Sequence, residues 1–339
     1  MQPIKFAVVG LGNIGPRHLA VLEAQPGAEI VSVCDLDQEK CRKYSSLYEV
    51  PWFTDYDEML RQTTAEVINI CTPHYLHAPM SIAAANMGKH ILVEKPMSLS
   101  NSEAQEMISV AERNSVRLMV VKQNRYNVPV VFAKQALDDG RLGRIFMTQC
   151  NVFWNRNPEY YSESTWRGKK PLEGGALFTQ VSHFIDLMIW WFGDVVHASA
   201  HVSNRYHDIE VEDCGFADIG FSSGVIGSLA WTTCVYRQNY EGSLTVVGEK
   251  GTIKIGGQYL NKIEFWDVQD YPLPDTLQFV DKPNAYGKYQ GTSSNHDKVI
   301  KEVINELLDQ QNRVVHGEEG VKTVQAIELI YQNAVAIQG

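Results

Sequence analysis

The sequence predicts two domains: an α/β domain built on a parallel sheet and, after it, an α+β domain with a large, mostly antiparallel open sheet. The chain has 339 residues, more than a single domain usually holds. In the first part of the chain, short apolar runs alternate with helical patterns, which is typical of a parallel sheet with helical crossovers. From Ile145 onward, strand-like runs dominate. We therefore expect domains at residues 1–125 and 126–339.

Composition and charge limit the functions that the chain can have. The hydrophobic fraction is 44% and the charged fraction is 21%, close to the averages of soluble globular proteins. The formal net charge is -10, and no run of Lys or Arg offsets it locally, which argues against a nucleic-acid or membrane partner. A small anionic ligand stays open, because a few local cations are enough to bind one.

The cysteines and the first residues of the sequence indicate the cellular compartment of the protein. The six cysteines form no CxxC pair and no metal-type spacing, so we expect free thiols and no metal site. The first apolar strand begins at Ile4 without a basic and apolar leader, and no apolar run is long enough to span a bilayer. These features predict a cytoplasmic protein.

The elements of the first domain follow one another as strand and helix. The expected strands are Ile4–Val9, Ala28–Cys34, Val67–Cys71, Ile91–Val93 and Leu118–Val121. Helical patterns cover Ile14–Ala24 and His77–Met87. Ser100 and Glu103 form a capping box for a further helix that runs toward Arg113. This alternation predicts a parallel sheet.

The second domain combines strands with a few helices. A helix is expected around Val131–Leu137, and strands follow from Ile145 through Ala230 and again over Val247–Phe265. A long apolar helix, Ala176–Trp191, interrupts them. Two amphipathic helices, residues 295–308 and 320–336, end the chain, and they are free to pack back on the first domain.

A glycine-rich turn joins the first strand to the first helix. Gly10-Leu11-Gly12-Asn13-Ile14-Gly15 matches the GxGxxG pattern between a strand and the helix that it opens. The first glycine makes the turn, the second lets the backbone approach a pyrophosphate, and the third lets helix and strand pack closely. Free amides at the start of the helix then bind phosphate. The turn predicts a Rossmann dinucleotide-binding domain whose expected cofactor contacts here are Gly10, Gly12, Asn13, Ile14 and Gly15.

Asp35 stands at the end of the second strand, where a dinucleotide fold places a carboxylate on the adenine ribose. The same carboxylate would repel a 2′-phosphate. Leu36 and Asp37 follow it, with no adjacent Arg that could accept such a phosphate. The sequence therefore favours NAD over NADP as cofactor.

Three further segments carry a resemblance to a known family. Thr72-Pro73-His74-Tyr75-Leu76-His77 and Glu94-Lys95-Pro96 each follow a strand, and GGALFTQVSHFID spans residues 174–186. With the glycine-rich turn, they resemble the TPxxxH, EKP and GGxLxDxGxHxxD motifs of the Gfo/Idh/MocA family over essentially the whole chain. The resemblance implies an NAD-dependent oxidoreductase, in which the cofactor is also contacted by Thr72, Pro73, His77, Glu94 and Lys95.

The resemblance places His183 on the catalytic histidine of the family. Thr179 lies four residues before it and Asp186 three residues after it, so a regular helix would put all three on one face as an active-site wall. Many relatives have an aspartate in the place of Thr179, so this chain lacks a carboxylate that could assist the base. A threonine hydroxyl can still form hydrogen bonds there. Asp186 could equally anchor its helix.

Oxidation of a secondary alcohol requires hydride transfer to the nicotinamide and loss of the hydroxyl proton. His183 suits the role of base, since an imidazole accepts a proton near neutral pH. Lys95 would stay protonated and stabilise the developing alkoxide. The opposite assignment, with Lys95 as base and His183 as the orienting group, stays open because burial is not known from sequence.

A loop before the catalytic helix is rich in aromatic and cationic side chains. Arginine can pair with phosphate or carboxylate, and tyrosine or tryptophan can stack on a sugar or a base. The pattern WNRNxxYY…WRG…GGALFxQxxHxxDL resembles bacterial UDP-N-acetylglucosaminuronate 3-dehydrogenases, which implies oxidation at C3 of a sugar nucleotide for surface polysaccharide synthesis. Expected substrate contacts are Arg156, Tyr160, Tyr161, Arg167, Thr179 and His183. Asn124, Trp166 and Arg167 complete the expected cofactor contacts.

Other functions stay open at this stage. An inositol or free-sugar dehydrogenase and an NAD-dependent glycosidase would share the scaffold, and a nucleotide-sensing regulator would be a non-enzymatic use of it. Lys95 and His183 together favour an enzyme. The resemblance also implies 2-oxoglutarate as an electron acceptor in some relatives, and assembly through the sheet as a homodimer or homotetramer.

Overall fold

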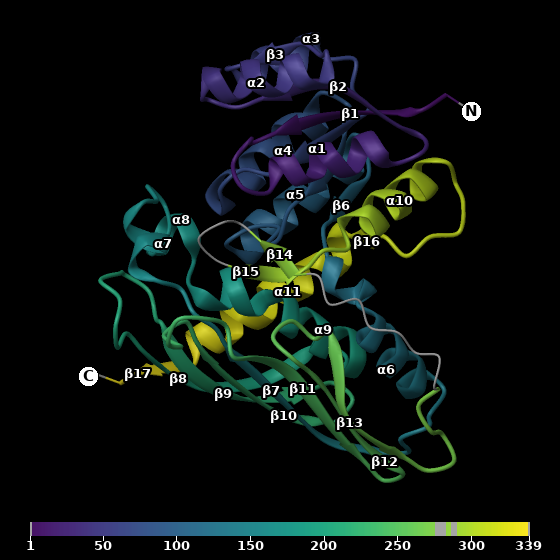
Figure 1. The fold of residues 1–339 in the computed structure, drawn as a ribbon, viewed down its shortest axis with the longest axis vertical. Helices are drawn as coiled ribbons and strands as arrows, with labels where there is room; N and C mark the ends of the chain where they lie inside the picture. Colours follow the sequence, from purple (N-terminus) through teal and green to yellow (C-terminus); the bar gives the residue numbers. More distant parts are fainter. Residues whose placement is uncertain (1, 275–282, 286–289, 338–339) are drawn as a thin grey trace. The chain divides into compact units, whose positions relative to one another are not determined.

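The computed structural model describes residues 2–274, 283–285 and 290–337 (Figure 1). The chain divides into two compact units. The first unit consists of Met1–Lys122 and His296–Val324, and the second of Gln123–Asn295 and Gln325–Gly339. The second unit thus begins at Gln123, whereas we expected the first domain to reach residue 125, and part of the C-terminal region belongs to the first unit.

The first unit is built on a seven-stranded sheet of order β16-β6-β5-β4-β1-β2-β3. Its strands are β1 (Ile4–Val9), β2 (Ala28–Cys34), β3 (Trp52–Phe53), β4 (Val67–Ile70), β5 (His90–Val93), β6 (Leu118–Val120) and β16 (Val315–His316). All neighbouring pairs are parallel except β16 with β6. The four residues of β4 are all buried, as expected for a parallel strand covered on both faces.

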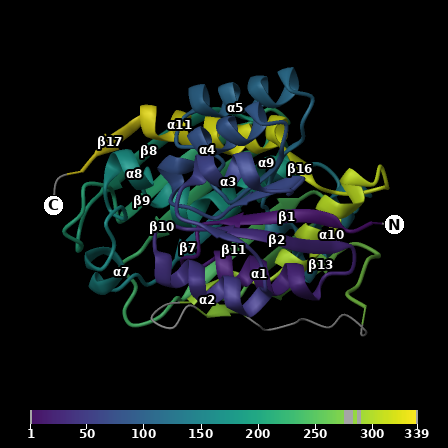
Figure 2. The ribbon, with the colours of Figure 1, turned by 90° about the horizontal axis from the view of Figure 1, so that it is seen from above.

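Helices cover both faces of this sheet. They are α1 (Gly15–Ala24), α2 (Gln38–Tyr48), α3 (Tyr56–Gln62), the short 3₁₀ turn η1 (His74–Leu76), α4 (His77–Asn86), α5 (Asn101–Arg113) and α10 (His296–Leu307). Figure 2 shows α1, α2 and α10 on one side of the sheet and α4 and α5 on the other. The predicted cap of α5 is present, because the Ser100 hydroxyl accepts the Glu103 amide. The α/β fold predicted for this half is confirmed.

The second unit contains an eight-stranded sheet of order β13-β12-β11-β7-β10-β9-β8-β17. Its strands are β7 (Ile145–Phe153), β8 (Val195–Ser203), β9 (Cys214–Phe221), β10 (Ile226–Thr232), β11 (Glu241–Gly248), β12 (Gly251–Gly256), β13 (Lys262–Val268) and β17 (Ala334–Ala336). Only β7 with β10 and β8 with β17 pair in parallel. The mostly antiparallel sheet predicted for this half is confirmed. A separate small ladder joins β14 (Pro283–Ala285) and β15 (Gln290–Ser293).

Helices of the second unit gather on one face of its sheet, as Figure 1 shows for α6 and α9. The helical elements are η2 (Gln123–Tyr126), α6 (Val128–Asp138), α7 (Pro158–Ser162), α8 (Lys170–Glu173), the π turn η3 (Leu177–Val181) and α9 (Ser182–Phe192). The last helix, α11 (Gly317–Gln332), begins in the first unit and ends in the second. Within the described chain, no helix is both long and apolar enough to cross a bilayer.

Two of the predicted helices differ from the structure. The long apolar helix expected over Ala176–Trp191 is divided into the π turn η3 and the α-helix α9. The last helix was expected to reach residue 336, but α11 ends at Gln332 and Ala334–Ala336 form strand β17. Pairing with β8 gives these residues backbone hydrogen bonds that outweigh their helical pattern.

Candidate active site

The glycine-rich turn is shaped by close backbone approaches. A Cβ on Gly10 would lie 2.7 Å from the Cys71 carbonyl carbon, and one on Gly15 would lie 2.0 Å from the Gly10 oxygen. At Gly12, a Cβ would meet no atom of the described residues within 4 Å. The chain itself therefore requires glycine at the first and third positions, whereas the second faces open space. That arrangement fits a pyrophosphate approaching the backbone at Gly12.

Asp35 fixes the shape of the same turn. One of its carboxylate oxygens accepts the Leu11 amide at 2.6 Å, and the other accepts the Asp37 amide at 2.9 Å. Among the described residues, no side-chain hydrogen bond caps the start of α1 at Ile14, and the positive end of the helix dipole favours an anion there. The predicted contacts Gly10, Gly12, Asn13, Ile14, Gly15 and Asp35 all lie in this turn or at the end of β2 beside it.

Thr72 and His77 organise the loop after β4. The Thr72 hydroxyl is buried and has no hydrogen-bond partner among the described residues. A buried hydroxyl without a partner costs free energy, so this atom suits a ligand. The ring nitrogens of His77 lie 2.6 Å from the Pro96 oxygen and 2.8 Å from the Thr72 oxygen. His77 therefore ties the two loops together, and burial lowers its pKa. A direct contact of His77 with the cofactor stays a prediction.

Glu94 is held by two histidines that are distant in sequence. His18 Nε2 lies 2.8 Å and His296 Nε2 lies 3.4 Å from the same carboxylate oxygen. Burial opposes ionisation of Glu94, but these contacts outweigh burial and hold its pKa well below its usual value. The other carboxylate oxygen accepts the Lys95 amide at 3.1 Å. Glu94 thus anchors the backbone of the segment that carries Lys95, while its predicted cofactor contact stays a prediction.

The helical segment that carries Thr179 and His183 belongs to the second unit. Two backbone amides at its N-terminus donate hydrogen bonds to side chains. The Ala176 amide donates to a Glu212 oxygen at 3.1 Å, and the Leu177 amide donates to the Tyr331 oxygen at 3.3 Å. Tyr331 donates its own proton to Glu212 at 2.6 Å. Burial raises the pKa of Glu212 to about 7.

Thr179 and His183 lie on either side of the change from π turn to α-helix. The Thr179 hydroxyl lies 3.1 Å from the Gly175 oxygen and is also hydrogen-bonded to the buried carboxyl of Glu173. Burial raises the pKa of Glu173. His183 is 4% exposed near the start of α9. A π turn inside a helix often marks a functional site, so the local backbone agrees with the predicted role of this segment.

Asp186 is paired with an arginine that sequence analysis missed. Arg125 binds the carboxylate through two hydrogen bonds, Nε to one oxygen at 2.7 Å and an Nη to the other at 2.8 Å, and both residues are buried. The guanidinium also lies 5.1 Å from the centre of the Trp190 ring. This pair fixes α9 to the segment just before α6. This pairing agrees with the structural alternative for Asp186, and its supporting role in the active site stays a prediction.

The loop before the catalytic helix gathers two arginines on one tyrosine ring. The guanidinium carbon of Arg167 lies 4.1 Å and that of Arg156 lies 5.2 Å from the centre of the Tyr160 ring. The Trp166 ring lies beside Arg167 at 5.3 Å. Tyr160 and Tyr161 pack edge to face with centres 4.9 Å apart. The structure thus brings together five residues predicted to bind substrate or cofactor.

Asn124 is buried in the 3₁₀ turn η2. Neither the nitrogen nor the oxygen of its side-chain amide has a hydrogen-bond partner among the described residues. A fully buried amide without partners is rare in folded proteins unless a ligand or water completes it. This observation supports the predicted cofactor contact of Asn124. Lys95 belongs to the first unit and His183 to the second, and their roles stay predictions.

Comparison with known families agrees with this geometry. Residues 4–122 match the Gfo/Idh/MocA oxidoreductase family in its NAD-binding Rossmann fold, and residues 130–254 match the C-terminal domain of the same family. The chain belongs to the Gfo/Idh/MocA family. As a member it is an oxidoreductase with NAD as its cofactor, and the predicted family resemblance, enzyme class and cofactor are confirmed.

Two solved Gfo/Idh/MocA structures are similar along nearly their whole length. The WlbA dehydrogenase of Bordetella pertussis, in complex with NADH and UDP-GlcNAcA, is 34% identical with a TM-score of 0.89, over 98% of this chain and 96% of that one. The WlbA dehydrogenase of Chromobacterium violaceum, in complex with the same two ligands, is 33% identical with a TM-score of 0.90, over 98% and 94%. The glucose-6-phosphate 3-dehydrogenase of Bacillus subtilis is 25% identical over 346 residues, 97% of this chain and 95% of the relative.

Several supporting residues of this family member escaped prediction. Arg125, Glu173, Glu212 and Tyr331 hold the segment that carries Thr179 and His183, while His18 and His296 hold Glu94. Only long-range contacts reveal these partners. The one available signal was the presence of charged or polar residues in apolar stretches, such as His18 within the first helix, since a buried polar group requires a partner.

Proposed function

We propose that the protein oxidises a secondary hydroxyl, at C3, of a sugar nucleotide such as UDP-N-acetylglucosaminuronate, with NAD as oxidant. The observation that carries the proposal is the likeness to the two WlbA dehydrogenases bound to NADH and UDP-GlcNAcA, which extends over 98% of this chain. Synthesis of a surface polysaccharide is the process that such a product would serve. The Arg156, Arg167 and Tyr160 cluster supports a diphosphate or carboxylate ligand.

In this proposal, NAD held by the glycine-rich turn and Asp35 would supply the hydride acceptor for the carbon that bears the hydroxyl. His183 takes the hydroxyl proton as general base. Lys95 donates a hydrogen bond to the oxygen as negative charge develops on it. The products are the ketone and NADH, and the proton leaves through the histidine. Glu94 and His77 keep the backbone at Lys95 in place, and Glu212 keeps the start of the His183 helix in place.

The test combines one substrate with two variants. The purified protein is incubated with NAD and UDP-N-acetylglucosaminuronate, with and without 2-oxoglutarate, and both NADH absorbance and the mass of the sugar nucleotide are followed. We expect the loss of two hydrogens from the sugar nucleotide. His183→Asn is expected to lower the rate about 100-fold or more, whereas His197→Asn, an exposed histidine of β8, serves as the control.

Each outcome has a distinct meaning. A need for 2-oxoglutarate would show that NADH is reoxidised in place. Protein that binds NAD but leaves the sugar nucleotide unchanged would overturn the proposed substrate. Release of an aglycone without net NADH would instead indicate the glycosidase reaction.

A phosphorylated free sugar is the second candidate substrate. The glucose-6-phosphate 3-dehydrogenase of Bacillus subtilis is similar over 97% of this chain, and the two arginines on Tyr160 would suit a single phosphate as well as a diphosphate. Glucose 6-phosphate, glucose and myo-inositol therefore form the comparison panel. Oxidation of glucose 6-phosphate with a higher kcat/KM than the sugar nucleotide would favour this candidate.

A further inference from the structure

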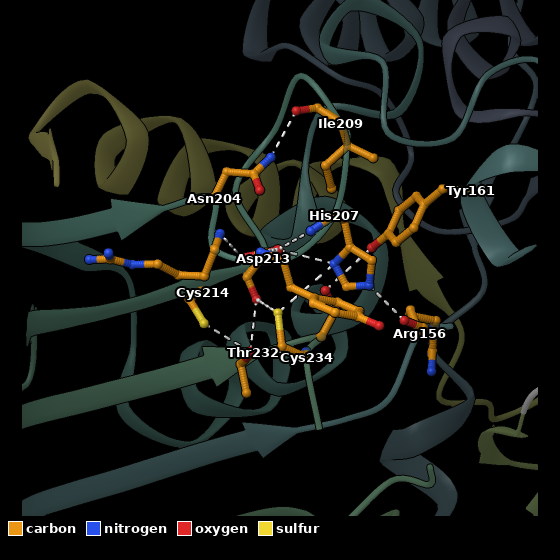
Figure 3. A network of polar contacts seen from close by, with 12 residues as sticks. Arg156, Tyr161, Asn204, His207, Ile209, Asp213, Cys214, Thr232 and Cys234 are labelled. Carbon is orange, nitrogen blue, oxygen red and sulfur yellow. Dashed lines mark hydrogen bonds and ion pairs between the residues drawn. The ribbon is translucent and has the colours of Figure 1, made fainter. Parts of the chain in front are cut away.

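Two cysteines of the second unit lie side by side, next to a buried histidine and aspartate (Figure 3). Cys214 begins β9 opposite Thr232 of β10, and Cys234 follows two residues after Thr232. The Thr232 hydroxyl lies 3.0 Å from the Cys214 sulfur and accepts the Cys234 amide at 3.0 Å. The Asp213 backbone oxygen accepts the Thr232 hydroxyl at 2.9 Å and lies 3.7 Å from the Cys234 sulfur. Backbone pairing and one hydroxyl thus hold both sulfurs at the same place.

His207 and Asp213 are the polar neighbours of the two cysteines. His207 Nδ1 lies 3.1 Å from Oδ2 of Asp213 and 3.9 Å from the Cys234 sulfur. The Asp213 carboxylate accepts the backbone amides of Arg205, Tyr206 and His207 at 2.8 to 3.0 Å. Burial opposes ionisation of Asp213, but these hydrogen bonds outweigh burial and keep its pKa below the usual value.

We propose that Cys214 and Cys234 are a redox-active dithiol that forms a reversible intramolecular disulfide. With hydrogen peroxide as oxidant, one thiolate attacks an oxygen, the O–O bond breaks, and the sulfur becomes a sulfenic acid as hydroxide leaves and is protonated to water. The second sulfur then attacks the first, a second water leaves, and two electrons have passed from the sulfurs to peroxide. With a small disulfide as oxidant, two thiol–disulfide exchanges give the same bond and release two small thiols.

The environment of these two cysteines differs from that of the other four. Cys214 and Cys234 are half-buried, whereas the remaining cysteines are buried. Contact with Cys234 lowers the pKa of Cys214 to about 6, and the same contact raises the pKa of Cys234. A lowered thiol pKa favours the thiolate, which is the reactive form of cysteine. Burial raises the pKa of the other four cysteines, Cys34, Cys41, Cys71 and Cys150.

The same side chains offer zinc-type ligand atoms, since His207, Asp213 and Cys234 place theirs within 4.8 Å of one another. The hydrogen bonds favour the dithiol instead. Oδ2 of Asp213 already faces two backbone amides and the imidazole, which is more than its two lone pairs accommodate well. A metal would have to displace these contacts. Bound zinc is therefore an outcome that would overturn the proposal.

His207 connects the dithiol to Arg156 and Tyr161, two of the predicted substrate contacts. Its Nε2 lies 2.7 Å from the Arg156 oxygen, and its ring centre lies 4.8 Å from that of Tyr161. Disulfide formation would draw the Cys234 sulfur to about 2.0 Å from that of Cys214, and its contact with His207 would change. We expect residues 154–168 to loosen as a result. This consequence bears on substrate binding only if the proposed function holds.

The primary experiment maps thiols in the intact protein. Reduced protein is treated with hydrogen peroxide or with oxidised glutathione, its free thiols are blocked with N-ethylmaleimide, and peptides are identified by mass spectrometry without reduction. We expect a Cys214–Cys234 linked peptide that dithiothreitol reverses. Cys34 and Cys41 provide an internal control, because they too are neighbours but are buried and should stay reduced.

Variants and metal analysis complete this test. Cys214→Ser and Cys234→Ser should each abolish the linked peptide while the remaining cysteine becomes labelled. A peptide that joins other cysteines, or two fully labelled thiols after oxidation, would overturn the proposal. So would one zinc ion per chain in protein purified without chelator, with release of that zinc on modification of the two thiols.

Hydrogen–deuterium exchange tests the connection to the loop. Peptides that cover residues 154–168 should exchange several-fold faster in the oxidised protein than in the reduced one, with no such change in β1 or β4. Equal exchange in the two states would refute the connection. Neither measurement requires substrate, so failure of the dithiol proposal is distinguishable from failure of the proposed function.

Discussion

At the scale of single residues, buried charges in this protein are held by partners that lie far away in the sequence. Arg125 and Asp186 are 61 residues apart and share two short hydrogen bonds. Glu94 is held by His18 and by His296. A buried charge is tolerated only when such partners satisfy it. A sequence motif can therefore identify a buried charged residue, but its partner is recognised only once the fold is known.

The Arg125–Asp186 pair gives the first prediction. Asp186→Asn keeps the shape of the side chain but leaves the Arg125 guanidinium buried without its counter-charge, so we expect a loss of about 3 kcal/mol in the free energy of unfolding. Urea unfolding followed by tryptophan fluorescence measures it. The double variant Arg125→Met/Asp186→Leu should recover part of the loss. A single variant as stable as the wild type would show that the pair is not structural.

Buried histidines predict a loss of stability in acid. Burial lowers the pKa of His77 and His296 from the ordinary value of 6.5. Because the unfolded chain takes up these protons first, their contribution to stability is complete above about pH 6.5 and is lost as the pH falls further. Each histidine contributes up to about 1.4 kcal/mol per pH unit. Glu94, whose pKa is also lowered, extends the loss to lower pH.

The measurement compares wild type with His296→Gln by urea unfolding between about pH 7 and pH 5. His18 and Glu94, which face His296 in the wild type, are present in both proteins, so the difference in slope isolates this one ring. We expect the wild type to lose stability more steeply than the variant as the pH falls. Parallel curves would mean that His296 is not the group that takes up the proton.

At the scale of helices and strands, the hydrophobic pattern was the main signal for the predicted boundaries. The strands Ile4–Val9 and Ala28–Cys34 were predicted with the observed ends, because short apolar runs bounded by turn residues are the signal of a buried parallel strand. The π turn at Leu177–Val181 was not predictable, since its residues have the same apolar character as an α-helix. Strand β17 depends on pairing with β8, which no local pattern encodes.

Glu212 gives a prediction for the element that carries His183. Its pKa is raised by burial to about 7, so the carboxyl is neutral in the folded protein at acidic pH. Its contribution to stability is fully present below the ordinary value of 4.5 and is lost as the pH rises through about 7. Glu212→Gln keeps an oxygen for the Ala176 amide and the Tyr331 hydroxyl but does not titrate. Between acidic and alkaline pH, the free energy of unfolding of the variant should therefore rise by up to about 3 kcal/mol relative to that of the wild type.

Thermal unfolding of both proteins at pH 5 and pH 8 measures this difference. The control is Glu264→Gln, which removes a carboxylate that is partly exposed on the sheet. Equal changes of Tm with pH in the wild type and Glu212→Gln would contradict the assignment.

At the scale of the whole molecule, the chain forms the first unit from two separate segments, since His296–Val324 joins Met1–Lys122. The helix α10 packs against α1, and β16 adds an antiparallel edge strand beside β6. The sequence indicated the helices of this region but could not indicate β16, a strand of two residues. Short edge strands carry too little pattern to be recognised before the sheet exists.

The large sheet of the second unit predicts self-association. Met147 and Ile226 are exposed and lie opposite each other in the ladder of β7 and β10, on the same face of the sheet. Adjacent exposed apolar side chains usually mark an interface. Cys214 pairs with Thr232 at the other end of β10, so this patch leaves the dithiol outside it. We expect a homodimer or homotetramer in light scattering, and Ile226→Glu should lower the measured mass. A wild-type monomer at micromolar concentration would refute the prediction.

The π turn before His183 affects the direction in which the His183 side chain points around the helix axis. A π turn contains about one residue more than the α-helical turn it replaces, and each residue of an α-helix advances the side chains by about 100°. If Leu177–Val181 wound as an α-helix with no residue deleted, the extra residue would turn His183 by about 100° relative to Ala176. The protein would keep every side chain of its motif yet present the imidazole to a different neighbour.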